Sequence, residues 1–598
     1  MTERQNPIHR RRKAWKPGVD MQIKRIPADF GWQFFDLLYR YLDPYLGSFQ
    51  RDKFKHVSRK RDMSAYLSLG DEVSAQWSSG TSTDRSTLER ASVYLLAKVL
   101  SKTQGMESLS GPERRKACLQ SVFSMDSELS PSIFLTPSDP VLLRARFWCR
   151  KFMGEAPDTE EIAQSVRHGP GSTADTPYFD RSAYFKYADW PYGVSPDCRA
   201  LFKQMITNDA RWFGSLEQDY RRRYDIPPWA ILNWSTFWST VLYDLKWNVV
   251  TSVPKNGAKD RPIAKEPLGN VYCQTALGTI LKRRFSSFGF DLTDQSRNRL
   301  LAKNASSDAR LTSPCTLDLS NASDTIHQSV VDYLVSTEWL LLLRSVRSEY
   351  GLWPNRFTWR YAKMSSMGNA TTFELESIIF ASVLYAVSDT YGDRSDRDSI
   401  SVFGDDLVFP RYLAPAVRMY LEAFGFQVNS KKSFVEGFFF ESCGTDWFEG
   451  RNIRPMFLRR TPESVQDLMV AHNQINIWFL RIFGCWAPRP VSEFFQRYAS
   501  SVPLGPLHTD TFDGWFFSPE WKGKSVRRIR AMMVPRSDAK DFWFRKLMHD
   551  LRQCDSDRGS RFTVTSRSRL NWSVWAPIRD DPNLGVVDWN GVRQDLVW

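Results

Sequence analysis

The sequence predicts an α+β fold built around an antiparallel sheet. Three observations indicate this class: a hairpin pattern at 399–410, an alternating strand pattern at 316–320, and helical apolar stripes that follow both. The two strands of a tight hairpin run antiparallel, so the sheet that contains them is expected to be antiparallel. With 598 residues, of which 42% are hydrophobic, the chain is expected to form about two to four structural units.

The hairpin pattern is centred on Gly404-Asp405-Asp406. Residues that favour β-strands flank the tripeptide on both sides, and the glycine supplies the unusual backbone angles of a tight turn. Adjacent carboxylates repel each other, and a divalent cation such as Mg²⁺ relieves that repulsion. The tripeptide therefore predicts a metal site, although a solvated acidic turn is the alternative interpretation when it is taken alone.

The strand pattern at 316–320 carries a third carboxylate, Asp318. Leu317 and Leu319 share one face of the expected strand and Asp318 points to the other, which predicts a half-buried strand. Asp324 lies just past its end. A helical stripe follows, made of Ile326, Val330 and Leu334. Two-metal phosphoryl transfer needs carboxylates from separate elements to hold cations about 3.5–4 Å apart, and Asp318 beside the hairpin meets that need. A surface Asp on an edge strand is the alternative.

Residues 364–376 predict a loop of small residues that enters a helix. The apolar stripe of this helix is made of Phe373, Phe380, Leu384 and Val387. Gly368, Thr372 and Glu376 recur at every fourth position and are expected to share one side of the helix. An ordinary amphipathic helix explains the stripe, but it does not explain the Ser-Ser-Met-Gly-Asn loop before it.

Two groups of cations flank these acidic elements. Residues 253–267 form a predicted loop, punctuated by Gly and Pro, whose Lys255, Lys259 and Arg261 can clamp a triphosphate. Downstream, a helical pattern from Ala414 precedes Lys431 and Lys432, and a Lys at this place can give a proton to leaving pyrophosphate. Solvated surface charge is the alternative for both groups.

Composition and the flanking segments add weaker expectations. A net charge of +14 and a pI near 9.3 suit a polyanionic partner. The scattered cysteines include no Cys-x-x-Cys pair, which argues against a zinc module and fits reduced cytoplasm. No apolar run approaches the length of about 18–20 residues needed to span a membrane, and the N-terminus lacks a signal-peptide pattern.

Four further segments were candidates for minor roles. The basic arm at 10–16 is expected to contact RNA or to act as a solubilising tail. The Gly/Pro loop at 167–175 is expected to line a template or nucleotide path or to be a plain connection. Thr461-Pro462 is expected to start a helix. The Trp- and Arg-rich last 140 residues are expected to stack on bases or to form core and surface.

Taken in order, these features resemble the motifs of the right-hand polymerases. The resemblance is closest to the RNA-directed RNA polymerase, or replicase beta subunit, of the single-stranded RNA bacteriophages (the levivirus group, Qβ-like), and it covers about residues 250–460. The segments that carry it are Val253-Pro254-Lys255-Asn256, 291–295, 318–324, Ser365-Ser366-Met367-Gly368-Asn369, 373–377, Gly404-Asp405-Asp406 and Glu441-Ser442-Cys443-Gly444.

The resemblance implies a fold, an activity and a metal requirement. Fingers with an N-terminal extension are expected at 1–300, a palm at 301–460 and a thumb at 461–598. The implied activity is RNA synthesis from NTPs on an RNA template, with release of pyrophosphate. Two Mg²⁺ ions, with Mn²⁺ as a substitute, are implied at Asp318, Asp405 and Asp406.

The resemblance also implies roles for other residues. Asp324 is expected to recognise the ribose, and Lys432, favoured over Lys431 by the Lys-Ser order, to act as the general acid. Many right-hand RNA polymerases carry Asn where this chain has Glu376, so the part of Glu376 in sugar selection stays open. The template and ribose loop maps to Ser366, Gly368 and Thr372, and the triphosphate site to Lys255, Lys259, Arg261 and, less directly, Lys265.

The implied partners are an RNA template and product, NTPs, and host proteins of an infected bacterium: elongation factors Tu and Ts and a ribosomal RNA-binding protein. The expected location is the host cytoplasm, with no membrane contact. Two alternatives remain. The first is a reverse transcriptase of the group II intron or retron kind, which would prefer dNTPs. Such enzymes usually lack a Gly before the Asp pair, so Gly404 argues against this alternative. An idle RNA-binding scaffold with a decayed polymerase fold would lack metal-dependent synthesis.

Overall fold

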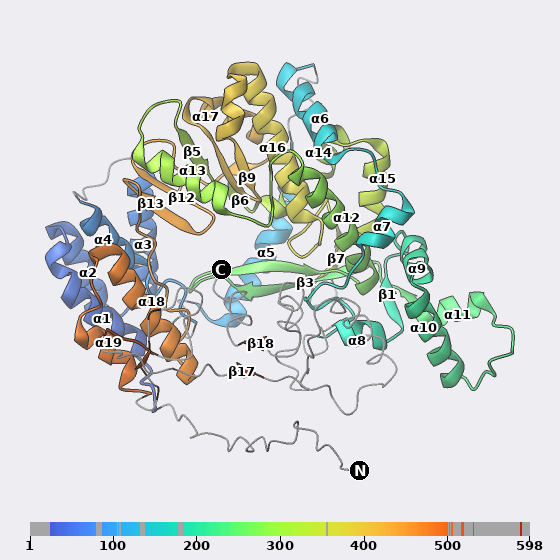
Figure 1. The fold of residues 1–598 in the computed structure, drawn as a ribbon, viewed down its shortest axis with the longest axis horizontal. Helices are drawn as coiled ribbons and strands as arrows, with labels where there is room; N and C mark the ends of the chain where they lie inside the picture. The colour runs from blue at the N-terminus through green and yellow to red at the C-terminus, as the bar shows by residue number, and fades with distance from the viewer. Residues whose placement is uncertain are drawn as a thin grey trace, which may run out of the picture.

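The computed structural model contains helices and strands in mixed order, which confirms the predicted α+β class (Figure 1). The residues it describes are 24–78, 86–104, 106, 109–131, 138–177, 183–353, 357–499, 502, 504–505, 507, 516–519, 530–531 and 587–588. The basic arm at 10–16 and the tryptophans at 515, 521, 543, 572, 575, 589 and 598 lie outside these residues, so the predictions made for them stay predictions.

A three-stranded antiparallel sheet lies at the centre of the site region. Its strands are β5 (Pro314–Leu317), β10 (Asp406–Pro410) and β9 (Ser401–Phe403), in the order β5-β10-β9. The predicted hairpin at 399–410 and the antiparallel sheet are thus confirmed. The chain breaks from the ladder at Asp318 and resumes as β6 (Leu319–Ser320), which pairs antiparallel with β11 (Gln427–Val428).

The strand pattern at 316–320 was only partly correct. Leu317 and Leu319 are buried as expected, but Thr316 is also buried, so β5 is covered on both faces. α13 (Ser296–Ser307) packs on β5, and residue 434 adds a single antiparallel bridge to Thr316. Alternation along one strand could not reveal this cover, because it comes from elements distant in the chain.

The helix after the small-residue loop is α16 (Thr372–Tyr391), which is buried on all sides from Glu374 to Ser388. The predicted one-sided apolar stripe is therefore wrong. α6 (Pro140–Met153), α12 (Leu268–Ser286), α17 (Ala414–Ala423) and β9 surround this helix (Figure 1). Small and hydroxyl side chains such as Ser377 and Ser382 fill the positions that looked polar, and each donates its hydroxyl to the helix carbonyl four residues earlier.

A second sheet carries the predicted cationic segment. Its strands are β4 (Asp260–Lys265), β3 (Trp247–Pro254), β7 (Tyr350–Leu352) and β8 (Thr358–Arg360), in that order. The predicted loop at 253–267 is therefore mostly a β-hairpin, and only 255–259 form its turn. Pro262 is tolerated in β4 because β4 is an edge strand. The turn reaches residues near the N-terminal helices, where the Gly257 amide donates to the Ser101 carbonyl at 3.0 Å.

Segments from the two ends of the described chain pack together at one side of the molecule (Figure 1). The N-terminal helices are α1 (Phe30–Leu42), α2 (Ser48–Lys60), α3 (Met63–Ser78) and α4 (Thr87–Lys98), and the C-terminal ones are α18 (Val465–Phe483) and α19 (Arg489–Gln496). The rings of Phe30 and Phe494 lie 4.8 Å apart. α18 does not start at Thr461 as predicted, because Ser464 forms a capping box with Asp467 and sets the start at Val465.

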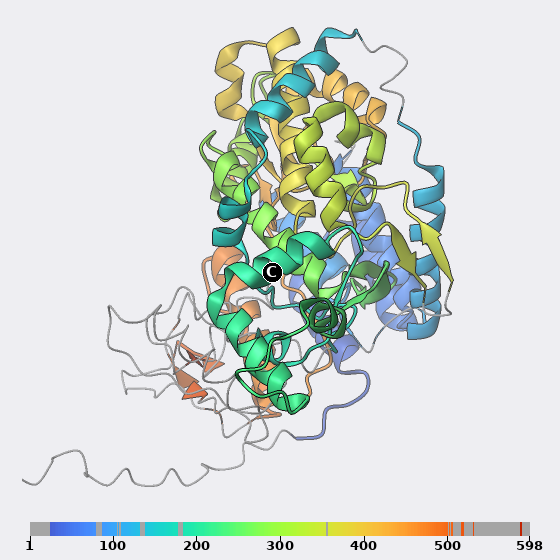
Figure 2. The ribbon, with the colours of Figure 1, turned by 90° about the vertical axis from the view of Figure 1, so that its right-hand side faces the viewer.

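The remaining helices cover the opposite side. Here α10 and α11 lie at one extreme of the molecule in Figure 1 and face the viewer in Figure 2. The elements of this side are α7 (Thr159–Ser165), α8 (Ala183–Ala188), β1 (Tyr192–Val194), α9 (Arg199–Asn208), α10 (Ala210–Arg223), α11 (Trp234–Val241), β2 (Leu242–Asp244), α14 (Gln328–Leu334) and α15 (Thr337–Val346). α5 (Gly111–Glu128) lies near the centre of the molecule in Figure 1 and packs on β3 and β4.

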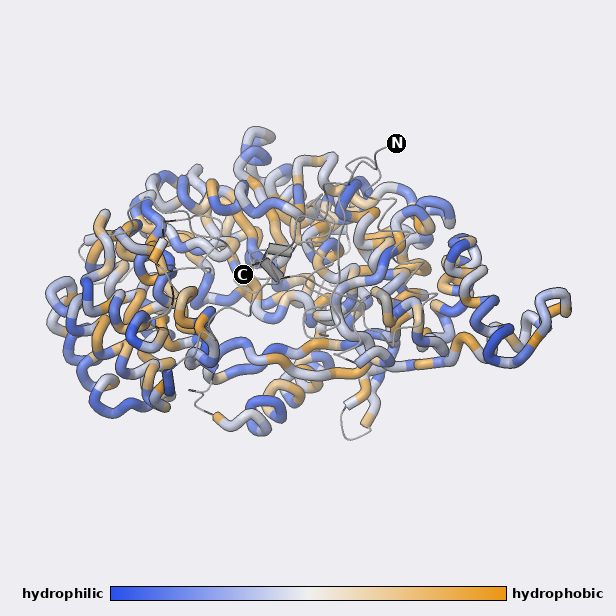
Figure 3. Tube along the Cα trace, turned by 60° about the horizontal axis from the view of Figure 1, so that its bottom comes forward, coloured by the Kyte–Doolittle hydropathy of each residue, from blue (hydrophilic) through white to orange (hydrophobic). Residues whose placement is uncertain are grey.

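The smaller strands are β12 (Phe439–Ser442), β13 (Thr445–Phe448), β14 (Arg451–Asn452), β15 (Leu504–Gly505), β16 (Phe516–Phe517), β17 (Arg530–Ala531) and β18 (Val587–Asp588). Hydrophilic and apolar residues alternate along most of the tube in Figure 3. Among the described residues, no helix is both long enough and apolar enough to cross a membrane.

Candidate active site

Strand register brings Asp318 and Asp406 to the same end of the central sheet. Leu317 of β5 pairs with Leu407 of β10 in an antiparallel ladder. Asp318 follows Leu317 and Asp406 precedes Leu407, so the antiparallel register brings both aspartates to the same end of the sheet. Asp405 occupies the adjacent turn and is exposed. Three carboxylates from two separate chain segments thus gather at one edge.

Gly404 makes the turn of this hairpin possible. Phe403 pairs with Asp406, so the turn contains only Gly404 and Asp405, and Gly404 has φ +60°. A Cβ at this position would lie 2.7 Å from the Phe373 ring and 3.0 Å from Glu376 Oε1. The Gly404 amide also donates to Ser377 Oγ at 3.0 Å. The turn therefore sits directly against α16, at a distance that only glycine permits.

The carboxylates of this edge repel one another in a desolvated environment. Burial raises the pKa of Asp318 to about 6, with Lys432 opposing the shift and Asp405 adding to it. Burial, followed by the charge of Asp405, raises the pKa of Asp406 to about 7. Both shifts indicate negative charge that the surrounding side chains do not fully compensate, and a bound cation would compensate it.

Asp318, Asp405 and Asp406 offer the carboxylate oxygens that a hard cation such as Mg²⁺ prefers. Their side chains are not, however, arranged around a common point. Within the described ranges, no three His, Cys, Asp or Glu side chains form a group that could hold a metal ion. Both oxygens of Asp318 already have partners: Asn429 Nδ2 at 2.7 Å from Oδ1 and Lys432 Nζ at 3.2 Å from Oδ2. Each oxygen keeps a second lone pair, so these partners orient the Asp318 carboxylate and leave it able to bind an ion.

The two candidate general acids have different surroundings. Lys432 Nζ lies against Asp318, whereas Lys431 Nζ lies 3.3 Å from Asp71 of α3, in an exposed pair. The charge of Glu441, then that of Asp318, holds the pKa of Lys432 above its usual value, while burial opposes the shift. Lys432 is therefore protonated at neutral pH, the state that a proton donor needs.

The cations of the β3–β4 hairpin approach the carboxylates from the second sheet. Partial desolvation, then the charges of Arg261 and Lys432, lowers the pKa of Lys255, and Asp318 and Asp405 oppose this shift. Lys259 lies in the turn, where its carbonyl accepts from the Lys255 amide at 3.0 Å. Arg261 stands opposite Val253 in the hairpin register. These three cations form no ion pair with any carboxylate that the structure describes.

The small-residue loop is held against β4. The Ala264 amide donates to the Met367 carbonyl at 2.8 Å. Gly368 has φ +121°, and a Cβ there would lie 2.1 Å from the Ala264 carbonyl oxygen. Gly368 therefore belongs to the loop, and the prediction that it shares a helix face with Thr372 and Glu376 is wrong, because α16 starts only at Thr372.

The hydroxyl of Thr372 closes this loop by donating to the Ser366 carbonyl at 2.9 Å. The Ser366 amide donates to Asn369 Oδ1 at 3.0 Å. Ser366 and Thr372 are both buried. In the described structure these two residues shape the loop, and a role in handling template or ribose stays a prediction.

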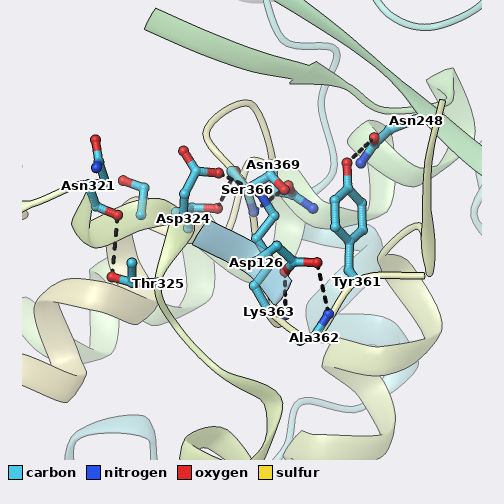
Figure 4. A network of polar contacts seen from close by, with 12 residues as sticks. Asp126, Asn248, Asn321, Asp324, Thr325, Tyr361, Ala362, Lys363, Ser366 and Asn369 are labelled. Atoms are coloured by element: carbon cyan, nitrogen blue, oxygen red, sulfur yellow. Dashed lines mark hydrogen bonds and ion pairs between the residues drawn. The ribbon is translucent and has the colours of Figure 1, made fainter. Parts of the chain in front are cut away.

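Glu376 lies against the Gly404 turn, and Asp324 follows the residue whose hydroxyl binds Glu376. Burial, then the charge of Asp405, raises the pKa of Glu376 to about 8, and Glu376 Oε2 accepts from Ser323 Oγ at 2.7 Å. Asp324 Oδ1 accepts from Lys363 Nζ at 2.7 Å (Figure 4). Lys363 was missed by the sequence analysis. It stands alone between β8 and the small-residue loop, and no local pattern marked it.

A family model described as RNA replicase, beta-chain, matches residues 135–536, which include every candidate site residue from Lys255 to Lys432. The chain belongs to the RNA replicase beta-chain family. This confirms the resemblance that the sequence motifs indicated.

Curated relatives of this replicase-family chain come from RNA phages. It is 38% identical over 268 residues to the RNA-directed RNA polymerase subunit beta of Enterobacteria phage SP, covering 45% of each chain. It is 37% identical over 371 residues to that of Escherichia virus Qbeta, covering 62% of this chain and 57% of the relative. The chain thus spans about half the length of the curated relatives it matches.

Among solved structures, the chain is similar to an insertion-loop deletion mutant of the RNA-dependent RNA polymerase of a human picobirnavirus. The alignment has a TM-score of 0.41 and 10% identity, and it covers 80% of this chain and 85% of the other. At this score the likeness adds nothing to the assignment of the replicase family.

Proposed function

We propose that this chain is an RNA-directed RNA polymerase that replicates a single-stranded RNA phage genome from NTPs. The observation that carries the proposal is the register of β5 and β10, which brings Asp318 and Asp406 to the same end of the sheet beside the Gly404-Asp405 turn, within a chain of the RNA replicase beta-chain family. Carboxylates from two strands at one sheet edge meet the requirement of two-metal nucleotidyl transfer.

In this proposal Asp318, Asp405 and Asp406 hold two Mg²⁺ ions, for which Mn²⁺ can substitute. Such ions supply activation of the primer 3′-hydroxyl and neutralisation of the triphosphate. The bond formed joins the 3′-oxygen to the α-phosphorus, and the bond broken releases pyrophosphate. The raised pKa values of Asp318 and Asp406 support this assignment, because they mark a place where added positive charge is stabilising.

The protein side chains divide the remaining work. Lys255, Lys259 and Arg261 bind the triphosphate, where the guanidinium fork of Arg261 can hold a phosphate with two hydrogen bonds. The absence of ion-pair partners for these cations among the described residues supports this role. Lys432 donates a proton to the leaving pyrophosphate. Asp324 accepts a hydrogen bond from the ribose 2′-hydroxyl.

We further propose the division into fingers (1–300), palm (301–460) and thumb (461–598). The palm then holds the central sheet with all three aspartates. We also propose that the chain works in the cytoplasm of an infected bacterium, with elongation factors Tu and Ts and a ribosomal RNA-binding protein as host partners. Its other proposed partners are an RNA template, the RNA product and NTPs.

Incorporation of labelled NTPs on added RNA tests the proposal. We expect Mg²⁺-dependent synthesis, with and without host extract as separate arms, and we expect Asp405→Asn to abolish synthesis while RNA binding stays nearly intact. Asp332→Asn is the matched control, because Asp332 of α14 forms an exposed ion pair with Arg344 of α15. Synthesis by Asp405→Asn within a few-fold of the unaltered chain would reject the metal assignment, and a preference for dNTPs would favour a reverse transcriptase.

A further inference from the structure

Lys363 is a buried cation that the proposed reaction does not use directly. Its side chain is 2% exposed, and its Nζ lies 2.7 Å from Oδ1 of Asp324, whose side chain is 6% exposed. A lone charge at such a depth is strongly unfavourable unless it is paired. Each of these two buried charges is therefore compensated by the other.

The backbone that carries Lys363 is fixed by a carboxylate from a different element. Asp126, near the end of α5, accepts from the Lys363 amide through Oδ1 at 3.0 Å and from the Ala362 amide through Oδ2 at 3.2 Å. Figure 4 shows Asp126 directed at both amides, on the side of Lys363 away from Asp324. Asp126 is itself buried, so the base of the Lys363 side chain has little freedom.

The chain segment after Asp324 runs alongside the segment of Lys363. The Met364 amide donates to the Ile326 carbonyl at 2.6 Å, and the Gln328 amide donates to the Ala362 carbonyl at 3.0 Å. The two segments are thus joined just beyond the ion pair. This pairing holds the Lys363 ammonium group within reach of Asp324 Oδ1.

One oxygen of Asp324 remains available. Oδ1 takes the Lys363 ammonium, whereas Oδ2 has no hydrogen-bond partner among the residues described. The neighbouring Ser323 hydroxyl binds Glu376, whose pKa responds to the charges of both Asp405 and Asp324. Asp324 therefore lies near Glu376 and the Gly404-Asp405 turn, and its Oδ2 can accept a hydrogen bond.

We propose that Lys363 is the positioning residue for Asp324, and that it sets the discrimination between NTP and dNTP. The inference rests on the proposed function, in which Asp324 accepts the 2′-hydroxyl. By binding Oδ1, the ammonium group turns the carboxylate so that Oδ2 meets the sugar. Lys363 does not touch the substrate and acts only through Asp324.

Steady-state incorporation of an NTP and the matching dNTP on one RNA template tests this role. Lys363→Met removes the charge and keeps most of the side-chain volume. We expect it to lower the NTP/dNTP ratio of kcat/KM by about 10- to 100-fold, the range seen when a partner that orients a binding group is lost. Lys363→Arg keeps the cation and is expected to restore part of the ratio. Arg344→Met, which removes an exposed ion pair, is the matched control.

Combination with Asp324→Ala separates positioning from other effects. Asp324→Ala should lower the ratio by itself, and adding Lys363→Met should lower it no further, since Lys363 acts only through Asp324. If Asp324→Ala lowers the ratio and Lys363→Met leaves it unchanged, the positioning role is wrong. An unchanged ratio in Asp324→Ala overturns both the sugar role of Asp324 and this inference.

A folding defect in Lys363→Met is detected by its melting temperature and RNA binding. In that case Asp126→Asn replaces it, because losing the carboxylate that accepts from the Lys363 and Ala362 amides weakens the hold on the Lys363 ammonium group. We expect the ratio to fall in the same direction, and an unchanged ratio would again overturn the positioning role. Failure of the unaltered chain to incorporate any NTP would overturn the proposed function itself, which distinguishes the two failures.

Discussion

Replacement of Glu376 by Gln tests whether the region beside the metal hairpin is as desolvated as the structure indicates. Glu376 is 4% exposed on α16. A Gln side chain has nearly the same size as Glu and keeps an oxygen that can accept from Ser323. The only large change is the loss of an ionisable group. The variant therefore isolates the free-energy cost of charging Glu376 in this environment.

The expected magnitude follows from the raised pKa. Burial moves the pKa of Glu376 from its ordinary 4.5 to about 8, so the folded chain holds this proton more tightly than the unfolded chain. The stabilisation is fully present below pH 4.5 and is lost as the pH rises through 8. The loss between pH 5 and pH 8 amounts to about 3 kcal/mol at roughly 1.4 kcal/mol per pKa unit. Glu376→Gln has no carboxyl at this position, so its unfolding free energy rises relative to that of the unaltered chain as the pH rises.

Urea unfolding at pH 5 and pH 8, with a chelator to exclude divalent cations, measures the effect. The quantity to compare is the difference in unfolding free energy between variant and unaltered chain, because other titrating groups cancel in it. Glu422→Gln on α17 is the matched control, since Glu422 is exposed, and its difference should stay flat. A Glu376→Gln difference that is equally flat would refute the inference that this carboxyl is desolvated.

Gly368→Ala is expected to destabilise the chain by about 1–3 kcal/mol through backbone strain, because Gly368 has φ +121° and the new Cβ would lie 2.1 Å from the Ala264 carbonyl oxygen. Urea unfolding measures this, and unchanged stability would mean that the loop can move away from β4. Lys432→Leu is expected to lower kcat by about 10²-fold with KM for NTP nearly constant, since a proton donor acts only in the transition state. Lys431→Leu should do less because only Lys432 reaches Asp318, and single-turnover kinetics showing greater sensitivity of Lys431 would move the general acid by one residue.

Local sequence patterns predicted the elements whose structure depends on near neighbours. The hairpin at 399–410 is confirmed because a glycine with positive φ and flanking strand residues determine a tight turn without help from distant segments. The predicted helical stripe is confirmed for Val330 and Leu334, which are buried on α14, whereas Ile326 is buried but lies before the helix begins.

Predictions failed where distant segments decide the environment. The Gly and Pro residues at 253–267 predict a loop, yet most of the segment is a β-hairpin in which β4 accommodates Pro262 at a sheet edge. α16 looked amphipathic and is buried all round, because helices and a strand from four other parts of the chain enclose it. Periodicity reports which face of an element is apolar, but not how many neighbours cover it.

The sequence alone determined the α+β class, the order of the acidic and cationic motifs, and through them the family of the chain. Only the tertiary structure decided which side chains meet. Asp318 and Asp406 lie at the same end of the sheet because of strand register. Lys432 reaches Asp318 across a separation of 114 residues, and Lys363 reaches Asp324 across 39. Such contacts depend on how separate elements pack, and the free energy of that packing comes from burying a shared core, which no local window of sequence contains.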